Sequence, residues 1–543
     1  MKISILNAAI AGLLLAGASA QALALELYVN TETQQIFAQP GPGRTRLGTF
    51  KQVDETAPPP VQAAEIASQK AEIEKIKDDL SLKNIELKAL TEQVKDPALG
   101  KTRVDEQGVR WESADGNFTV KLNGRVQLDA QVNTDQSGVA AAKPGAFSND
   151  LANGTSIRRA RLSAEGNMFK TYGYKFEYDF TRGNGSTAGG VTDAFMTWNG
   201  YAPLTLTAGQ FKEPISIEEA TSDIQTSFIE RNMAVNAFID NNNVFKMGLG
   251  GKFAQPRWTA QTAIQTESMG NGAPTTDTSS TNGNGNANRN GGSGDTGWGL
   301  TGRLTGLPWF QDKSHLLHVG AAGSQRYINV NPDTLPCNPT SSNNNCFSAN
   351  GNGARFGSAI DSNVDRSLLL DTGFISKANG SISTQTVTRL GGEFAAVHGP
   401  FSVQGEYLQA QVSGNGLNNN NLNGYYAFAS WFLTGESRNY NEKVGIFDRI
   451  KPAANFTTLG RGLGAWEFLA GYDYLDLNSG AIHGGRASTS KFGLNWYPTS
   501  RIRVMTNFIH VLELDTLNSA SAQARAFNGT HPDIFEMRTQ LDF

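Results

Sequence analysis

The sequence predicts an all-β protein: a transmembrane antiparallel β-barrel of about 16 strands, preceded by a short N-terminal α-helical coiled coil. Three observations lead to this fold class. Apolar and polar residues alternate with a period of two in many segments from Phe118 to the end of the chain. Long Gly/Asn/Ser-rich stretches separate some of these segments, and short turns separate others. Beyond residue 24 the chain of 543 residues has no apolar run of about 18 residues, so no transmembrane helix is expected.

Residues 1–24 have the three parts of a secretory signal peptide. Lys2 supplies the positive start, residues 3–17 form the apolar core, and residues 22–24 (ALA) form a small-x-small cleavage site, with residues 18–20 (ASA) as a second choice. An N-terminal anchor helix is the alternative. The short apolar run and the small residues after it favour the signal peptide, so we expect an exported protein.

The chain has two cysteines, Cys337 and Cys346, in a Pro/Asn/Ser-rich loop. In an exported protein two cysteines this close together most often form a local disulfide. Zinc is not expected, because no histidine or second cysteine pair lies nearby. We therefore predict a disulfide that closes an exposed loop.

Two segments precede the barrel. Residues 25–60 are short and mixed and end in a proline run, which predicts a stiff spacer. Residues 61–97 have apolar residues at a strict seven-residue period, which predicts a coiled-coil helix of about four heptads. The periodic residues are Ile66, Ile73, Leu80, Leu87 and Val94, with Ile76 and Leu90 three places after two of them. Because Gln69 and Lys83 are polar at the intermediate positions, a single amphipathic helix on a surface is the alternative.

Residues 105–543 supply the barrel strands. Examples with one apolar and one polar face are FTVKLNGRVQLDAQV (118–132), YKFEYDF (174–180) and the terminal IFEMRTQLDF (534–543). A soluble sandwich is the alternative, since its strands also have a dry face and a wet face. Strands of about 8–12 residues, aromatics near strand ends and a terminal aromatic on the apolar face favour the membrane barrel. About 440 residues, at about 25–28 per strand and connection, give roughly 16 strands and a water-filled lumen.

The segment SIRRARLSAEG (156–166) carries three arginines. By parity, Leu162 faces lipid while Arg159 and Arg161 face the lumen. Arg158 has lipid-side parity, and an arginine there at mid-depth would cost about 2–4 kcal/mol, so we expect it at the strand start, within reach of a polar layer. Arginines facing a narrowed pore attract anions and repel cations. The alternative is that Arg159 and Arg161 pair with lumen carboxylates of neighbouring strands and stiffen the wall.

Over most of residues 115–543 the sequence resembles the phosphate-selective porin O/P family of Gram-negative outer membranes. The motifs that carry the resemblance include KLNGRVQLD (121–129), IRRARL (157–162), VTDAFMTW (191–198), AGQFKEPISIEEATS (208–222) and FLTGESRNYNEKVGIFDRIKP (432–452). The resemblance implies a homotrimer of 16-stranded barrels, surrounded by outer-membrane lipid and lipopolysaccharide. It also implies passive diffusion of small hydrophilic solutes, anions such as phosphate among them. A loop from about Glu213 to Asn243 would fold inward and narrow the pore.

The resemblance also implies a set of pore residues. The family strand that resembles IRRAR lends two arginines to the constriction, and these map to Arg158 and Arg159, against the parity argument for Arg158. Asp193 and Arg125 match two further constriction residues. An aspartate among arginines can accept a hydrogen bond from a protonated oxyanion. This chain has Glu219 where anion-selective members have a lysine, and a carboxylate there would offset the attraction of the arginines for phosphate.

We therefore predict a pore site that contains both positively and negatively charged side chains. Its members are Arg125, Arg158, Arg159, Arg161, Asp193 and Glu219. A general non-selective porin is the alternative, and so is a structural barrel that ties envelope layers together through its coiled coil, which would lie in the periplasm.

No catalytic, metal or cofactor site is expected. The histidines are His315, His318, His398, His483, His510 and His531. None lies in a nucleophile elbow or a paired metal spacing, and the glycine clusters are low-complexity loops rather than phosphate-binding turns before a helix. A net charge of −4 gives no indication of a nucleic-acid partner. An enzyme is therefore not predicted.

Overall fold

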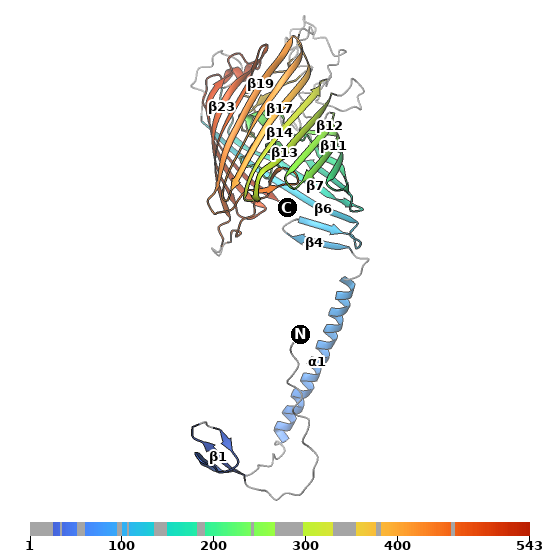
Figure 1. Ribbon diagram of the computed structural model, residues 1–543, viewed down its shortest axis with the longest axis vertical. Coiled ribbons are helices and arrows are strands. Elements are labelled where there is room, and N and C mark those ends of the chain that lie inside the picture. Colours follow the sequence, from blue (N-terminus) through green and yellow to red (C-terminus); the bar gives the residue numbers. More distant parts are fainter. Residues whose placement is uncertain are drawn as a thin grey trace. The chain divides into compact units, whose positions relative to one another are not determined.

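The computed structural model (Figure 1) describes residues 25–32, 35–50, 60–94, 100–105, 108–134, 149–181, 190–239, 244–266, 297–328, 354–375, 382–457 and 462–543. The chain forms two compact units, Met1–Asp96 and Pro97–Phe543. The signal peptide and the Cys337–Cys346 disulfide fall outside the described residues and stay predictions.

The N-terminal unit begins with a small antiparallel sheet. β1 (Leu25–Asn30), β2 (Ile36–Phe37) and β3 (Arg44–Phe50) pair in the order β2-β1-β3. The Arg44 guanidinium lies 3.4 Å from the centre of the Phe37 ring, a cation–π contact across the sheet. From the sequence, residues 25–60 are only a short mixed segment that ends in a proline spacer, and the three strands were not predicted because strands this short show no clear period.

The N-terminal unit continues with the long helix α1 (Pro60–Val94) of 35 residues, which confirms a helix in the segment predicted as 61–97. Pro60 takes the first helical position, where a missing N–H leaves no hydrogen bond unmade. Ile73, Ile76, Leu80 and Leu87 each expose between 55% and 65% of their surface. These four heptad residues are therefore not buried by this unit of a single chain. Among the helices in the described part of the chain, none has the length and apolar character needed to cross a lipid bilayer.

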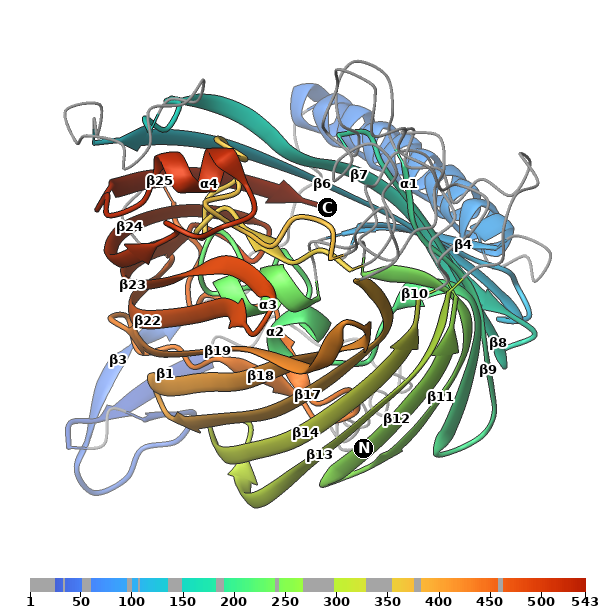
Figure 2. The same cartoon turned by 90° about the horizontal axis from the view of Figure 1, so that it is seen from above.

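The second unit is a closed antiparallel barrel, and Figure 2 shows its ring of strands from above. Its sixteen strands are β6 (Phe118–Asn133), β7 (Gly154–Met168), β8 (Tyr172–Asp179), β9 (Gly190–Tyr201), β10 (Leu204–Lys212), β11 (Phe245–Gln255), β12 (Trp258–Gln265), β13 (Trp298–Asp312), β14 (His315–Tyr327), β17 (Ser383–His398), β18 (Phe401–Asn415), β19 (Leu417–Phe432), β22 (Ala465–Ser479), β23 (Ile482–Tyr497), β24 (Ile502–Asp515) and β25 (Asp533–Asp542). Each pairs with its neighbour in sequence, and β25 pairs with β6 to close the ring. The predicted barrel of about 16 strands is confirmed.

β6 pairs with a different strand along each half of its length. A hairpin of β4 (Lys101–Asp105) and β5 (Gly108–Glu112) pairs with the first half, and β25 pairs with the second half. At the junction Gly124 and Phe543 exchange two backbone hydrogen bonds of 3.1 and 3.0 Å. A Cβ on Gly124 would lie 2.2 Å from the Phe543 ring. Glycine at this position lets the C-terminal strand lie against β6.

The strands have one apolar face and one polar face, as predicted. On the outside, Leu122, Val126 and Leu162 expose between 37% and 51% of their surface. Lumen-facing polar residues such as Gln127 and Arg159 are almost fully buried. Apolar residues outside and polar residues inside are the arrangement of a membrane barrel, so the two-sheet sandwich is wrong.

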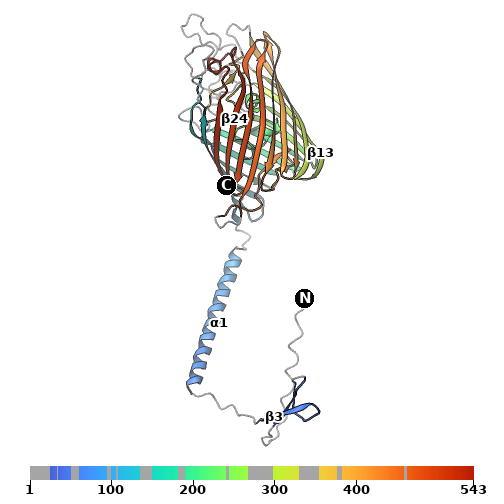
Figure 3. The ribbon, with the colours of Figure 1, turned by 90° about the vertical axis from the view of Figure 1, so that its left-hand side faces the viewer.

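Aromatic pairs lie near both ends of the strands. Trp466 and Trp496 stack at one end, with ring centres 5.5 Å apart, and Trp298 and Tyr327 stack at the other, 4.7 Å apart. The long, tilted strands between the two ends are seen from the side in Figure 3. Rings at both ends of the apolar band agree with the predicted interfacial girdles.

Candidate functional site in the barrel lumen

Three connections fold into the barrel. The inward loop (213–244) joins β10 to β11 and carries α2 (Ile217–Ala220) and α3 (Met233–Phe238), which lie within the ring of strands in Figure 2. The cap segment (354–375), which is the described part of the connection from β14 to β17, carries β15 (Gly357–Ser358) and β16 (Leu370–Asp371). The turn-side segment (433–464) joins β19 to β22 and carries β20 (Asn439–Asn441) and β21 (Ile446–Asp448). Because successive strands alternate in direction, the first two enter from one end (the loop end) and the third from the other (the turn end).

The inward loop is held by an apolar cluster inside the barrel. Its buried residues Phe228, Met233 and Phe238 belong to the same cluster as Leu408 and Leu469 of the wall. The Phe228 and Phe428 rings meet edge to face, with centres 5.6 Å apart. Burial of these side chains holds the loop across the lumen, as the resemblance implied for residues 213–243.

Arg125, Arg159 and Arg161, here called the arginine triad, converge on one carboxylate. Arg125 on β6 and Arg161 on β7 are direct cross-strand partners. Asp223 of the inward loop lies 2.9 Å from Nη1 of Arg161 and 3.0 Å from Nε of Arg159, and it accepts a hydrogen bond from Arg125. Glu177 on β8 accepts from Arg125 at 2.5 Å and from Arg161 at 3.2 Å. The alternative in which lumen carboxylates pair with Arg159 and Arg161 therefore fits the geometry.

Arg158 does not sit where parity placed it. The register of β6 and β7 shifts by one residue between Gln127 and Leu128, so that Arg158 forms a β-bulge. The extra residue turns both Arg158 and Arg159 inward. Nε and Nη2 of Arg158 donate to Glu230 of the inward loop at 2.8 and 3.0 Å. The parity prediction is wrong because a bulge breaks the strict alternation, and Arg158 lies against the inward loop inside the barrel.

A second register shift, between Phe176 and Tyr178 of β8, lies beside Asp193 on β9. Asp193 is 8% exposed and accepts a hydrogen bond of 2.5 Å from Nζ of Lys175. It therefore lies in the lumen, next to a lysine.

Glu219 is fully buried within the inward loop. Its carboxylate lies 2.7 Å from Nζ of Lys212 and 2.9 Å from Nε of Arg231. The adjacent Glu218 accepts a hydrogen bond from Gln404 of the wall at 2.8 Å. Both glutamates therefore join the loop to the barrel, and neither carboxylate faces open lumen.

The charges around the arginine triad balance. The cations are Arg125, Arg158, Arg159, Arg161 and Lys175, and the carboxylates are Glu177, Asp179, Asp193, Asp223 and Glu230. Burial alone would raise the pKa of Asp223 in the loop, but the charges of Arg125, Arg161 and Arg159 outweigh it and hold that pKa well below its usual value. Burial also opposes ionisation of Glu230, and Arg158 and Arg538 lower its pKa. Both loop carboxylates are therefore charged at neutral pH.

A cavity of about 890 Å³ extends from the triad to the turn end. It is bounded by the wall at β6–β8, by Ser222 and Gln225 of the inward loop, and by the turn-side segment. Its cationic lining residues are Lys121, Arg125, Arg161, Lys175, Arg449, Lys451 and Arg501, and its acidic ones are Asp105, Glu165, Glu177, Asp448 and Asp542. Seven cations face five carboxylates and the terminal carboxylate of Phe543, so one positive charge is in excess.

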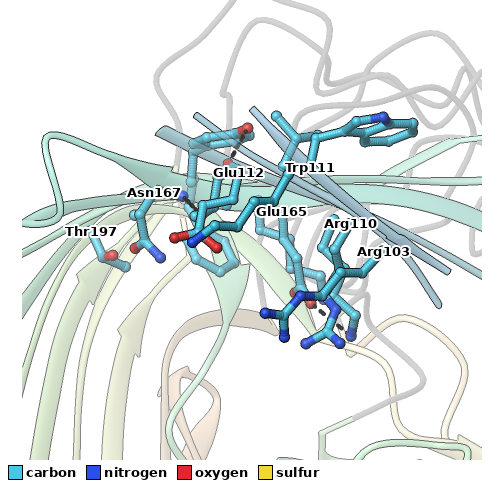
Figure 4. Close-up of a pocket in the computed structure, with 16 residues that line it drawn as sticks. Arg103, Arg110, Trp111, Glu112, Glu165, Asn167 and Thr197 are labelled. Carbon is cyan, nitrogen blue, oxygen red and sulfur yellow. Dashed lines mark hydrogen bonds and ion pairs between the residues drawn. The ribbon is translucent and has the colours of Figure 1, made fainter. Parts of the chain in front are cut away.

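A groove of about 510 Å³ lies beside this cavity, between the β4–β5 hairpin and β6–β9. Arg103, Arg110 and Lys121 are successive cross-strand partners on one face of the sheet. Figure 4 shows Arg103 and Arg110 side by side, with Trp111 directed away from them. Arg110 pairs with Asp105, and Lys121 lies 3.5 Å from Glu165. The groove extends the mixed, mainly basic lining beyond the closed ring.

Sequence reasoning missed the loop carboxylates and the turn-side segment. Asp223 directly follows the motif AGQFKEPISIEEATS (208–222), and Glu230 lies seven residues further on, but nothing in one sequence says which arginine a loop carboxylate meets. The turn-side segment lies in the motif 432–452, and its burial could have been suspected from the aromatic residues Tyr440 and Phe447 in an otherwise polar stretch.

Comparison with known proteins gives consistent matches. A family model described as phosphate-selective porin O and P matches residues 120–543. Porin O of Pseudomonas aeruginosa is 26% identical over 421 residues, covering 74% of this chain and 85% of the relative. Among solved structures, the anion-selective porin from Comamonas acidovorans shares 11% identity and covers 78% of this chain and all (100%) of its own, with a TM-score of 0.45. OmpT of Vibrio cholerae in its trimer form shares 11% identity and covers 78% of this chain and 99% of its own, with a TM-score of 0.42.

Proposed function

Since the chain belongs to the phosphate-selective porin O and P family, we propose that this outer-membrane porin passes small hydrophilic solutes by diffusion, with a modest preference for anions such as phosphate. The observation that carries the preference is the lining of the 890 Å³ cavity, in which seven cations face five acidic side chains and the chain terminus. In a narrow pore a fixed excess charge raises the local concentration of counter-ions.

The mechanism is passive. Solute moves down its gradient through water, the inward loop and the turn-side segment set the width, and the lining charges set the ion preference. Because carboxylates balance the charges around the arginine triad and also pair with Lys121, Arg449 and Arg501, the excess positive charge along the path is small. We therefore propose weak anion selectivity rather than tight phosphate binding.

The zero-current potential of the reconstituted protein in a KCl gradient tests this proposal. We expect a potential of the sign given by chloride permeation and clearly smaller than the ideal chloride potential, because the excess charge is small. Replacing Lys121 and Arg449 with glutamine is expected to move it towards zero or past it. A cation-selective potential in the unmodified protein would contradict the proposed preference, and absence of any channel would contradict the porin itself.

We further propose that the barrels assemble as homotrimers and that α1 forms a parallel coiled coil of three copies in the periplasm. The exposed apolar heptad residues of α1 support this, because a heptad seam becomes buried only against other helices. A helix of 35 residues spans about 52 Å, which is long enough for a periplasmic tether as a second role.

Replacing Ile73 and Leu80 with asparagine is expected to weaken the trimer without changing conductance. Two buried apolar positions per helix would be lost, and semi-native electrophoresis after heating should show monomers at a lower temperature than in the parent. Asparagine at the polar heptad positions Gln69 and Lys83 is the control and should leave the transition in place. If the Ile73/Leu80 variant and the Gln69/Lys83 control dissociate to monomers at the same temperature, the proposed coiled coil is contradicted. Loss of envelope attachment on deletion of 61–97, with conductance retained, would support the tether.

A further inference from the structure

The arginine triad places three positive charges on one face of two neighbouring strands. Arg125 and Arg161 are directly opposite each other, and Arg159 lies two residues along β7. Like charges in opposite positions destabilise a sheet. The three side chains expose only 12%, 5% and 10% of their surface, so solvent screens the repulsion weakly. The triad therefore needs an anion at the point where the guanidinium groups meet.

Asp223 supplies that anion from the inward loop, which is not part of the barrel wall. One oxygen accepts from Arg125, and the other lies 3.0 Å from Arg159 and 2.9 Å from Arg161. The carbonyl of Asp223 accepts hydrogen bonds from Gln127 and Thr226, both of 3.3 Å, so the loop backbone is fixed at this point. Several guanidinium groups around one oxyanion is the usual arrangement of a protein site for phosphate or carboxylate ligands.

The Asp223 carboxylate does not accept hydrogen bonds from all the donors of the arginine triad. Within the described residues, Asp223 is the one carboxylate within ion-pair distance of Arg159. The Nε of Arg159 is buried and lies 3.0 Å from the Asp223 carboxylate, but the angle of this contact does not make a hydrogen bond. Arg125 and Arg161 have Glu177 as a further partner. A tetrahedral oxyanion has more acceptor oxygens than a carboxylate and would satisfy donors that Asp223 leaves unused.

We propose that Asp223 is a built-in counter-anion that occupies the oxyanion position of the arginine triad and so determines the specificity of the channel. With the carboxylate in place, the triad holds the inward loop and permeating oxyanions pass without tight binding. With the carboxylate removed, the triad becomes a phosphate site. The inference rests on the proposed function only in that the triad borders the permeation path.

The test is the block of chloride current by inorganic phosphate in single channels of Asp223→Asn. Phosphate is expected to block this variant at a concentration at least about tenfold below that needed for the parent, because the three guanidinium groups lose the counter-charge that they share. Asp371→Asn is the matched control. It removes another buried loop carboxylate, which pairs with Arg355 at 2.7 Å and not with a triad arginine, and it should behave as the parent does. The double variant Asp223→Asn/Arg159→Gln should lose the gained block.

Three outcomes would overturn the proposal. They are no gain of block in Asp223→Asn, an equal gain in Asp371→Asn, and block of the unmodified protein at the concentration that blocks Asp223→Asn. Folding is checked by the heat-dependent shift in electrophoretic mobility. If Asp223→Asn does not fold, the phosphate series on the parent decides the matter, since tight block there means that Asp223 does not occupy the site. If the parent forms no channels, the proposed function is wrong, but this result does not decide the proposal about Asp223. Titration calorimetry with phosphate can then compare phosphate binding by the folded parent and by folded Asp223→Asn.

Discussion

Replacing Arg538 with glutamine is expected to destabilise the barrel by about 3–5 kcal/mol, because it leaves buried carboxylates without a counter-charge. Arg538 on β25 is 1% exposed and donates to both oxygens of Asp129 on β6 at 2.7 Å. It also donates to Glu230 of the inward loop at 2.7 Å and to the backbone carbonyl of Ile229. One side chain thus joins the closing strand, the first strand and the loop.

The urea midpoint of unfolding from detergent micelles or lipid bilayers measures this effect. Arg486→Gln is the matched control, because Arg486 on β23 also pairs with a carboxylate, Glu513 at 2.7 Å, but both side chains are more than a third exposed. An exposed pair contributes about 0–1 kcal/mol, so this variant should unfold close to the parent. If both variants unfold alike, Arg538 does not link the seam to the loop.

Arg538→Gln should also change the channel. With Glu230 held by Arg158 alone, the end of the inward loop near Ile229 loses two of its anchors. Single-channel records are expected to show larger current fluctuations than the parent. Quiet records with an unchanged conductance would show that the apolar cluster alone holds the loop.

The strands could be predicted from the sequence because each strand has its own period-two pattern. The faces of β6 and β25 follow directly from the alternation in 118–132 and 534–543. The position of Arg158 could not be derived in this way. A single bulge between β6 and β7 reverses the parity of every residue beyond it, and no local signal in IRRAR marks the extra residue.

The charge state of the site could not be predicted either. The arginines are visible in the sequence, but their counter-ions come from β8 and from the inward loop, which the fold alone brings together. Asp223 is 98 positions from Arg125 in the chain, and Glu230 is 72 from Arg158. Counting arginines in the sequence therefore overstates the net positive charge of the lumen. An estimate of ion selectivity also requires knowing which carboxylates pair with these arginines.

Replacing Tyr440 with alanine is expected to release the turn-side segment from the lumen and raise conductance. The Tyr440 ring is 1% exposed and meets Phe447 edge to face at 5.6 Å, and its hydroxyl lies 2.6 Å from Nδ1 of His318 on β14. Both rings belong to a buried apolar cluster with Leu316 and Val397 of the wall. Removing a buried aromatic side chain costs about 3–5 kcal/mol, which would weaken the attachment of the segment to the wall at this point.

Two measurements separate release of the segment from a general loss of stability. Single-channel conductance should rise in Tyr440→Ala, and limited proteolysis should cut within residues 433–457 faster than in the parent. Tyr440→Phe is the control, because it keeps the ring and loses only the contact with His318, about 1 kcal/mol, so its conductance should equal that of the parent. Another anchor is the 2.8 Å hydrogen bond that Nη2 of Arg303 donates to the Gly445 carbonyl. Arg449 of the segment also pairs with Asp542 of β25. Parent-like conductance and proteolysis in Tyr440→Ala would mean that these polar contacts, rather than the aromatic cluster, keep the segment in the lumen.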